Sequence, residues 1–395
     1  MHPRTLSVLA VIALGGVVPA LLLESHAGEA MPIFAQAYGV KCSVCHTLVP
    51  QLNAYGRFVQ ASAYSTLDRE TLNRSLPVWI DESLQYDSTA GAGTGAPRYD
   101  FGNLGIHALG YATPNVTYHI QQWFVQDNQS GGLDTAWASY NNLLHRDAHL
   151  YVGKIEPPAP SVYSMTSDID GPTASSTLVG EHDWGATFDN RWGSKLEYVH
   201  NNLDLQGGYL WSGADLNGIV DFSPGDKSFE WKASYSPVKV PITGGFFGSL
   251  GSLPVSTGQD YYWSYAPYLQ IDPHVNGIPG LLAIYQWQGD NNPGVDSNTG
   301  NIMPSVWSRG SSVEIYESLF NGNAVFSARH DINYDGYRTV TVGNALNFGF
   351  NVPHFPYAHV YFETLLGGES SLNGVTGGPE WKATLWLTLP VSKAR

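Results

Sequence analysis

Cys42, Cys45 and His46 are the residues whose types and spacing point most clearly to chemistry. They form the string Cys-Ser-Val-Cys-His, in which a histidine directly follows the second of two thiols. This is the spacing that attaches haem c: the thiols add to the porphyrin vinyl groups, and the histidine takes one axial position on the iron. The sequence contains no other cysteine, so no other thiol competes for this role. We therefore predict one covalently bound haem c.

Three other interpretations of the cysteine pair have less support. A zinc site would need a second cysteine pair or a His-x₃₋₅-His pair nearby, and neither is present. A thioredoxin-like redox pair would need a surrounding βαβ pattern, which is also missing. A structural disulfide would have to close across only two intervening residues. An export signal upstream favours haem c, because this haem is attached after translocation.

The candidates for the second axial ligand of the iron can be limited by counting the histidines and methionines near the motif. Between residues 31 and 80, the sequence has no histidine besides His46 and no methionine besides Met31. Met31 is therefore a candidate ligand, through its sulfur or, after cleavage at Ala30, through a new amino group. Otherwise the iron is five-coordinate or takes a later histidine that faces the interior of a barrel, the candidates being His107, His119, His149 and His200. Arg57 is either a partner for a haem propionate or an ordinary surface arginine.

The haem motif lies between an export signal and a long β-rich region. Residues 1–30 have the features of a signal peptide: Arg4 supplies a positive charge, Leu6–Leu23 is apolar, and small residues suited to cleavage follow. An uncleaved anchor is the alternative, since the apolar stretch is long. Residues 31–76, the cytochrome segment, are too few to hold a core alone, so we expect the haem or the barrel to support them.

Two helices are predicted in the cytochrome segment. The first carries apolar side chains at three-to-four spacing, namely Leu52, Tyr55 and Phe58 or Val59. The second begins at Ser65 or Thr66, has acidic residues in its first turn at Asp68 and Glu70, and ends before Pro77. These acidic side chains fit the positive end of a helix better than a role in acid–base catalysis.

Residues 77–395 have the pattern of a transmembrane β-barrel. Only 13% of the chain is charged, 13% is aromatic, and glycine occurs 43 times. Segments of about ten residues alternate in polarity and are separated by Gly, Asn, Asp and Pro turns. Counting from Val78 to Leu389 gives about sixteen strands. We therefore predict a mainly β fold: an antiparallel barrel of about sixteen strands, preceded by a small α-helical monohaem cytochrome c segment.

A soluble β-sandwich would also alternate, so other features must place the sheet in a membrane. Aromatic residues near strand ends resemble interfacial girdles; examples are Tyr261, Tyr262, Trp263, Tyr265, Tyr268, Tyr357 and Tyr361. Long Gly-, Asn-, Pro- and Asp-rich stretches are the expected outer loops: Ser88–Ala96, Pro157–Ser176 and Gly289–Met303. The net charge of −15 argues against binding to nucleic acid and against electrostatic docking on anionic lipid.

Around the haem motif, the chain resembles the outer-membrane porin–cytochrome fusions of iron-oxidising bacteria. The resemblance covers about thirty residues closely and the remainder in architecture only. The residues that carry it are Phe34-Ala35, Gly39, Cys42-Ser43-Val44-Cys45-His46, Pro50 and Leu52-Asn53-Ala54-Tyr55-Gly56-Arg57-Phe58. The haem motif alone is common to many cytochromes; followed by Leu-Asn-Ala-Tyr-Gly-Arg and a barrel, it becomes fairly specific.

The resemblance implies oxidation of extracellular Fe(II) at the cell outer membrane. Electrons would then pass through a haem in or under the barrel to a periplasmic c-type cytochrome. Acidic residues of the outer loops would gather Fe(II) as hard oxygen ligands, or would be solvated charges; they are Asp168, Asp170, Asp290 and Asp296. Two alternatives stay open. In the first, the barrel is a porin-like sleeve whose cytochrome docks a separate redox partner. In the second, the chain is a soluble periplasmic cytochrome with a β-sandwich domain.

Overall fold

The computed structural model describes residues 32–48, 51–73, 77–88, 98–126, 129–158, 178–211, 225–237, 240–273, 279–296, 299–336, 340–352, 355, 357–370, 375–376 and 380–391. The predicted signal peptide and Met31 lie outside these ranges. In the described parts of the chain, no helix is both long enough and apolar enough to span a membrane.

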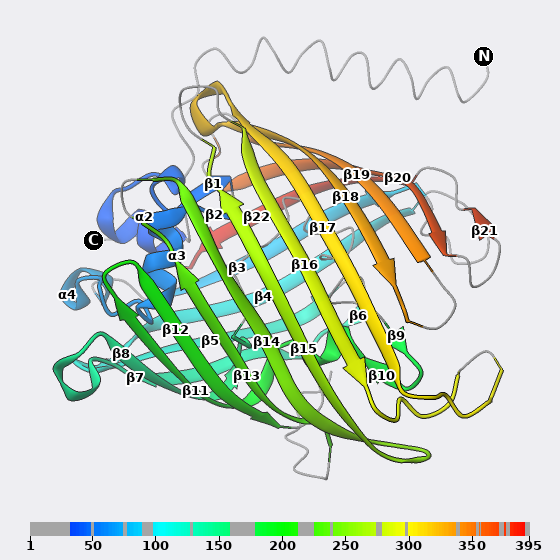
Figure 1. Cartoon of the computed structure of the whole chain (residues 1–395). Coiled ribbons are helices and arrows are strands. Elements are labelled where there is room, and N and C mark those ends of the chain that lie inside the picture. The colour runs from blue at the N-terminus through cyan, green and yellow to red at the C-terminus, as the bar shows by residue number, and fades with distance from the viewer. Residues whose placement is uncertain are drawn as a thin grey trace, which may run out of the picture.

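Within the described ranges, sixteen long strands form one closed antiparallel barrel (Figure 1). They are β3 (Val78–Asp87), β4 (Arg98–Thr113), β5 (Val116–Gln126), β7 (Leu133–Tyr140), β8 (Ala148–Ile155), β11 (Arg191–His200), β12 (Leu203–Trp211), β13 (Lys227–Tyr235), β14 (Ile242–Val255), β15 (Gly258–Ile271), β16 (Gly280–Asp290), β17 (Val306–Leu319), β18 (Ala324–Tyr334), β19 (Val340–Asn351), β20 (Ala358–Ser370) and β22 (Glu380–Pro390). Two-residue strands β6 (Gln129–Ser130) and β21 (Val375–Thr376) extend hairpins beside them.

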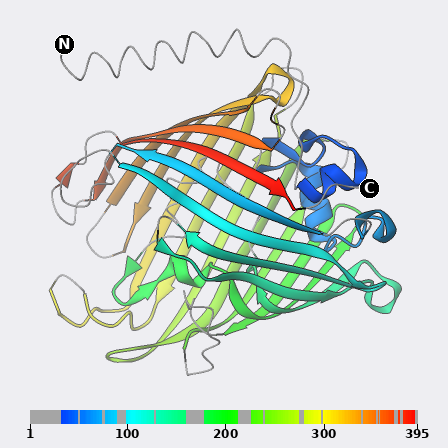
Figure 2. The ribbon, with the colours of Figure 1, turned by 180° about the vertical axis from the view of Figure 1, so that it is seen from behind.

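The barrel closes where its last strand meets its first. Leu385 of β22 pairs with Leu84 of β3, and Thr388 pairs with Asp81. Figure 2 shows these two strands side by side, red against light blue. Full closure leaves no unpaired sheet edge. The predicted fold class is therefore confirmed, from the closed barrel of sixteen strands to the short helices that precede it.

Side chains alternate between the lumen and the outer surface along each strand, because successive residues of a strand point to opposite faces. In β13, Glu230 and Lys232 face the lumen and are 0% and 7% exposed. Phe229 and Tyr235 of the same strand face outward and are 49% and 55% exposed. The alternation predicted for this segment is confirmed.

The aromatic residues near strand ends do not all lie on the outer surface. Tyr261 and Tyr265 face outward, as expected of a girdle. Tyr262, Tyr268 and Tyr361 are instead buried in the lumen, so their assignment to a girdle was wrong. An aromatic residue near a strand end suits a membrane interface only if its position in the alternation also turns it outward.

The two ends of the barrel differ in the length of their connections. At one end β4 joins β5, and β11 joins β12, through two-residue turns. At the other end β8 and β11 are separated by residues 156–190, and β16 and β17 by residues 291–305. The helices that precede β3 gather at the end with short turns (Figure 1). We call the two ends the short-turn end and the long-loop end.

The segment predicted to be a cytochrome, for which we keep the name cytochrome segment, contains α2 (Pro32–Tyr38), the 3₁₀-helix η2 (Cys42–Val44), β1 (His46–Leu48), β2 (Gln51–Leu52), α3 (Ala54–Ala61) and α4 (Arg69–Leu72) in its described residues. Helix α3 confirms the first predicted helix for Tyr55, Phe58 and Val59, but Leu52 lies in β2 before the helix begins. Helix α2 was not predicted. Helix α4 begins later than expected, and Asp68 is its N-cap rather than a residue of its first turn: the carboxylate accepts a 2.8 Å hydrogen bond from the Thr71 amide.

The cytochrome segment shares a hydrophobic core with the wall of the barrel. Phe34 and Tyr64 are in ring contact, and Tyr64 stacks on Trp137 of β7 at a centroid distance of 6.3 Å. The hydroxyl of Thr117, on β5, donates a 2.9 Å hydrogen bond to the carbonyl of Ala63. This agrees with the expectation that so short a segment depends on the barrel for support.

A second segment folds into the lumen from the long-loop end. It contains β9 (Leu178–Val179), β10 (His182–Asp183) and the short helix α5 (Trp184–Thr187). Trp184 is fully buried and packs edge-on against Tyr262 of β15, and Phe188 packs against Phe247 of β14. This inserted segment, residues 178–190, was not predicted from the sequence.

Candidate functional site

The cysteine–histidine motif forms a tight loop at the short-turn end. The two thiols belong to η2 and the turn after it, and they are not bonded to each other. Cys42 is 4% exposed, and burial raises the pKa of the Cys45 thiol above its usual value. A Cβ on Gly322, in the turn between β17 and β18, would lie 3.9 Å from the Cβ of Ser43. The loop is therefore held against the rim of the barrel.

Asn53 connects this loop to helix α3. Its side-chain amide donates to the carbonyls of Ser43 and Val44, at 3.2 and 3.1 Å. Its side-chain oxygen accepts a 3.0 Å hydrogen bond from the amide of Gly56, which caps the helix. Its own amide donates to the carbonyl of Cys45 at 2.9 Å. One residue thus fixes both the start of α3 and the backbone between the cysteines.

Gly56 lets α3 approach the loop closely. A Cβ at this position would overlap the carbonyl oxygen of Cys45. Glycine is otherwise unfavourable inside a helix, by about 1 kcal/mol relative to alanine. The close approach to the Cys45 carbonyl is a physical reason for glycine here.

Arg57 joins the cytochrome segment to the wall. Its guanidinium lies 3.0 and 2.7 Å from the two carboxylate oxygens of Asp272, just after β15, and donates to Thr243 of β14 at 3.2 Å. It also donates to the carbonyl of Leu52 at 2.8 Å. Arg57 is 12% exposed, so it is not an ordinary surface arginine. Its predicted contact with a haem propionate stays a prediction.

His46 is 8% exposed and lies within electrostatic range of His359, on β20, a histidine that was not predicted as a ligand from the sequence. His359 is 1% exposed, and its Nδ1 lies 2.8 Å from the side-chain oxygen of Asn351. If Nδ1 donates in this bond, Nε2 carries the lone pair that ligates metals. The alternation along β20 could have predicted this histidine, because His359 and Tyr361 are two residues apart and face the same side of the strand. Assigning Tyr361 to the outer surface therefore also placed His359, wrongly, on that surface.

His107 and His119, which were predicted to face inward, do so on the neighbouring strands β4 and β5. His107 stacks on Trp79 at 4.8 Å between ring centroids, and its Nε2 lies 2.9 Å from a carboxylate oxygen of Asp81. His119 lies 6.3 Å from His107 and is 5% exposed. Neither ring nitrogen of His119 has a hydrogen-bond partner among the described residues.

The remaining predicted histidines are not placed for ligation. His149 faces the lumen, but its ring nitrogens lie 3.0 Å from Asn141 and 2.8 Å from Asp147, so both are engaged. His200 is exposed on the outer surface, and its predicted inward orientation was wrong. The strand places its odd-numbered residues in the lumen, including Glu197 and Val199.

Of the acidic residues predicted in the outer loops, Asp168 and Asp170 lie outside the described ranges. Asp290 is the last residue of β16 and is fully buried, with its Oδ1 2.5 Å from Nδ1 of His182. Asp296 is 7% exposed, and one of its carboxylate oxygens accepts a 3.0 Å hydrogen bond from Thr299. Neither described residue is a solvated loop charge.

A cavity of about 1160 Å³ lies in the lumen between α3 and the wall. Its lining includes Arg57 and Asp272 together with charged wall residues such as Lys195, Glu197, Asp204 and Lys232. Lys232 and Asp204 form an ion pair at 2.8 Å. The cavity therefore combines charged groups with apolar and aromatic side chains next to the helix that carries Arg57.

No family model and no curated protein matches the sequence. Solved structures of outer-membrane porins do match the fold. The anion-selective porin from Comamonas acidovorans aligns with a TM-score of 0.55 at 10% identity, covering 79% of this chain and 98% of that one. OprB of Pseudomonas putida aligns with a TM-score of 0.56 at 10% identity, covering 81% of this chain and 96% of OprB. Salmonella typhi OmpF aligns at 0.54 and 12% identity, covering 79% and 96%. The chain has the porin fold.

Proposed function

We propose that this chain is an outer-membrane electron-transfer protein that carries one haem c at the short-turn end of a porin-like barrel. Electrons would move between an extracellular donor, Fe(II) in the first instance, and a periplasmic c-type cytochrome. One observation carries the proposal: a Cys-x-x-Cys-His loop lies at the mouth of a closed barrel, with its histidine within electrostatic range of His359 of the inner wall.

The donors of the loop fit a haem c. Two thiols that are not joined in a disulfide lie three residues apart, and the buried His46 follows them. When bound, the haem iron supplies one-electron redox chemistry, tuned by its axial ligands and its burial. Cys42 and Cys45 would hold it covalently, and His46 would ligate its iron. His359 is the wall residue that would be a second protein ligand, with Met31 as the alternative from the sequence.

The other residues of the site would maintain this arrangement. Asn53 holds the backbone of the loop, Gly56 lets α3 pack on it, and the Arg57–Asp272 ion pair joins the helix to the wall. Trp79 and the wall histidines would exclude bulk water around the site. Burial of this kind stabilises one axial geometry and shifts the reduction potential.

A second candidate is a porin-type barrel whose cytochrome segment docks a separate redox partner. The similar structures include an anion-selective porin and an outer-membrane channel, and the cavity in the lumen, with its charged side chains, is compatible with a passage. In this case the haem would still be attached, but Fe(II) would not reduce it directly.

Two measurements on the detergent-solubilised full chain test both candidates. Mass spectrometry should find the mass of one porphyrin attached, and the Cys42→Ala/Cys45→Ala variant should lack it. Anaerobic titration with Fe(II), followed through the haem Soret and α bands, should then reduce the haem. A chain without porphyrin would refute the proposal. A haem that Fe(II) does not reduce at any accessible pH would favour the second candidate.

A further inference from the structure

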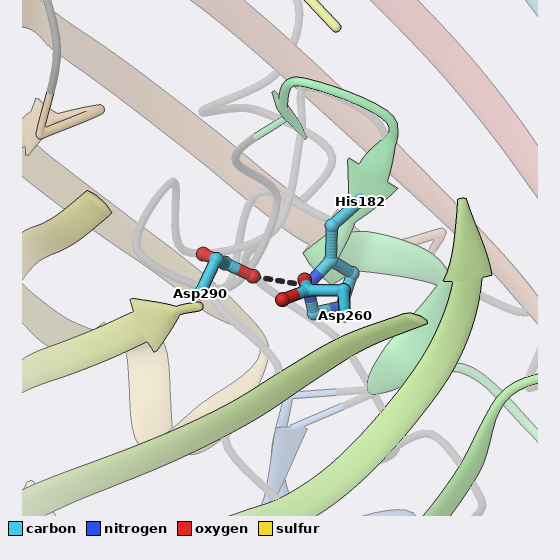
Figure 3. Close-up of side chains that lie close together, drawn as sticks. All are labelled: His182, Asp260 and Asp290. Atoms are coloured by element: carbon cyan, nitrogen blue, oxygen red, sulfur yellow. Dashed lines mark hydrogen bonds and ion pairs between the residues drawn. The ribbon is translucent and has the colours of Figure 1, made fainter. Parts of the chain in front are cut away.

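His182, Asp260 and Asp290 meet at the long-loop end of the lumen, far from the haem motif in sequence and at the opposite end of the barrel (Figure 3). His182 comes from β10 of the inserted segment, Asp260 from the start of β15, and Asp290 from the end of β16. They are 1%, 0% and 0% exposed. One ligand atom from each lies within 4.8 Å of the other two.

The carboxylates of Asp260 and Asp290 have few basic partners among the described residues. Within the described ranges, the ion-pair partner of both carboxylates is His182: Nδ1 lies 2.5 Å from Oδ1 of Asp290 and 3.7 Å from Oδ2 of Asp260. Oδ2 of Asp260 is buried and accepts no hydrogen bond from the part of the chain that the structure describes. Arg191, the nearby arginine, is already paired with Asp226 and Glu230. Buried carboxylates without full compensation are costly, so this cluster favours an added cation.

The surroundings hold the three side chains in place. Nε2 of His182 lies 2.9 Å from the hydroxyl of Thr187, which leaves Nδ1 for the carboxylates. The indole of Trp184 donates to Oδ2 of Asp290 at 3.2 Å. The amide of Asn292 donates to Oδ1 of Asp260 at 2.8 Å. Hydrogen bonds of this kind orient the ligands of metal sites and fix the histidine tautomer.

We propose that His182, Asp260 and Asp290 form a binding site for one divalent first-row transition cation. Imidazole nitrogen with two carboxylate oxygens suits ions such as Mn(II), Fe(II) or Zn(II). Bonds of about 2.0–2.2 Å place the ligands of one ion up to about 4.4 Å apart, so small shifts would close the site. The ion replaces the proton between Nδ1 and Asp290, and it ties the inserted segment to β15 and β16. The site does not depend on the haem.

Binding of Mn(II) to the folded, detergent-solubilised full chain tests the site, since free Mn(II) has a six-line EPR signal that weakens on binding. We expect one Mn(II) per chain, displaced by Zn(II) but not by equal Mg(II), because the imidazole favours the transition ion. Asp260→Asn and His182→Gln should each weaken binding at least tenfold. Asp183→Asn removes the same charge from an exposed residue beside His182 and should change the affinity less than twofold.

Two results would overturn this site. One is the absence of saturable Mn(II) binding by the folded wild-type chain. The other is equal weakening by Asp183→Asn, which would mean diffuse attraction to acidic loops. Heat-modifiable gel mobility reports whether each variant still forms the barrel. His182→Gln lies on the inserted segment rather than the wall, so it keeps the test valid if Asp260→Asn does not fold.

Discussion

Arg57 of α3 and Asp272 beyond β15 form a two-pronged ion pair across 215 residues of sequence, with both side chains about nine-tenths buried. Paired contacts of a guanidinium with a carboxylate fix orientation as well as distance. The pair therefore sets where the cysteine loop lies relative to the wall. Since Asp272 follows a lumen-lining strand, its position depends on closure of the barrel.

Replacing Arg57 by alanine should detach the cytochrome segment without unfolding the barrel. Losing one partner of a buried ion pair costs about 3 kcal/mol, because the other charge stays buried and unpaired. We expect limited proteolysis to cleave residues 32–73 much faster in Arg57→Ala, while heat-modifiable mobility stays normal. The Arg57→Ala/Asp272→Asn double variant should be less affected than the sum of the two single variants. Additive effects would mean that the two side chains do not act as a pair.

Gly56→Ala should lower the yield of haem c, although alanine favours a helix. Helix propensity alone predicts stabilisation by about 1 kcal/mol. The new methyl group would instead overlap the Cys45 carbonyl and push the loop away from α3. The haem absorbance per unit of folded protein distinguishes the two effects, because helix propensity would raise the yield of haem c and the overlap with the Cys45 carbonyl would lower it. An unchanged or higher yield would show that the close packing is not needed.

His359→Ala should change the spectrum of the bound haem. Loss of an axial imidazole leaves a five-coordinate or water-ligated iron, which shifts the Soret band and the spin state. His149→Ala is the matched control, because both ring nitrogens of that buried histidine are occupied by Asn141 and Asp147. If the His359→Ala spectrum matches the wild type, Met31 or another group is the ligand.

A lysine on the outer face of β5 should destabilise the barrel in a bilayer, whereas a lysine on the inner face should not. Ile120 is 45% exposed and points outward, and Gln121 has the lumen-facing parity of His119. A charge at the middle of the membrane costs about 2–4 kcal/mol on the lipid face of a barrel. Ile120→Lys should therefore fold less completely into lipid vesicles than Gln121→Lys. Equal folding would argue that this face does not contact lipid.

The barrel could be predicted from sequence because its determinants are local. Alternation with a period of two and turn residues between strands define each segment without any tertiary information. The first strand begins at Val78, as predicted, and the last ends at Pro390, one residue later than expected. The inward positions of His107 and His119 follow from the same rule.

The inserted segment and the cluster around His182 could not be predicted in this way. His182, Asp260 and Asp290 are far apart in sequence, and only the pairing of β15 with β16, which aligns Tyr262 with Asp290, brings the two carboxylates together. The inserted segment has strands of two residues and a helix of four, too short for any periodicity to show. Helix α2 was not predicted because its seven residues are also too few to show a periodic pattern.

The burial of Cys42 has a consequence for biogenesis. An enzyme that attaches a porphyrin to a thiol must reach the sulfur atom, and only 4% of this residue is accessible in the folded chain. On our proposal, prosthetic-group loading must precede docking of residues 32–73 on the barrel. The exported chain would have to keep its N-terminal portion exposed until the porphyrin was attached.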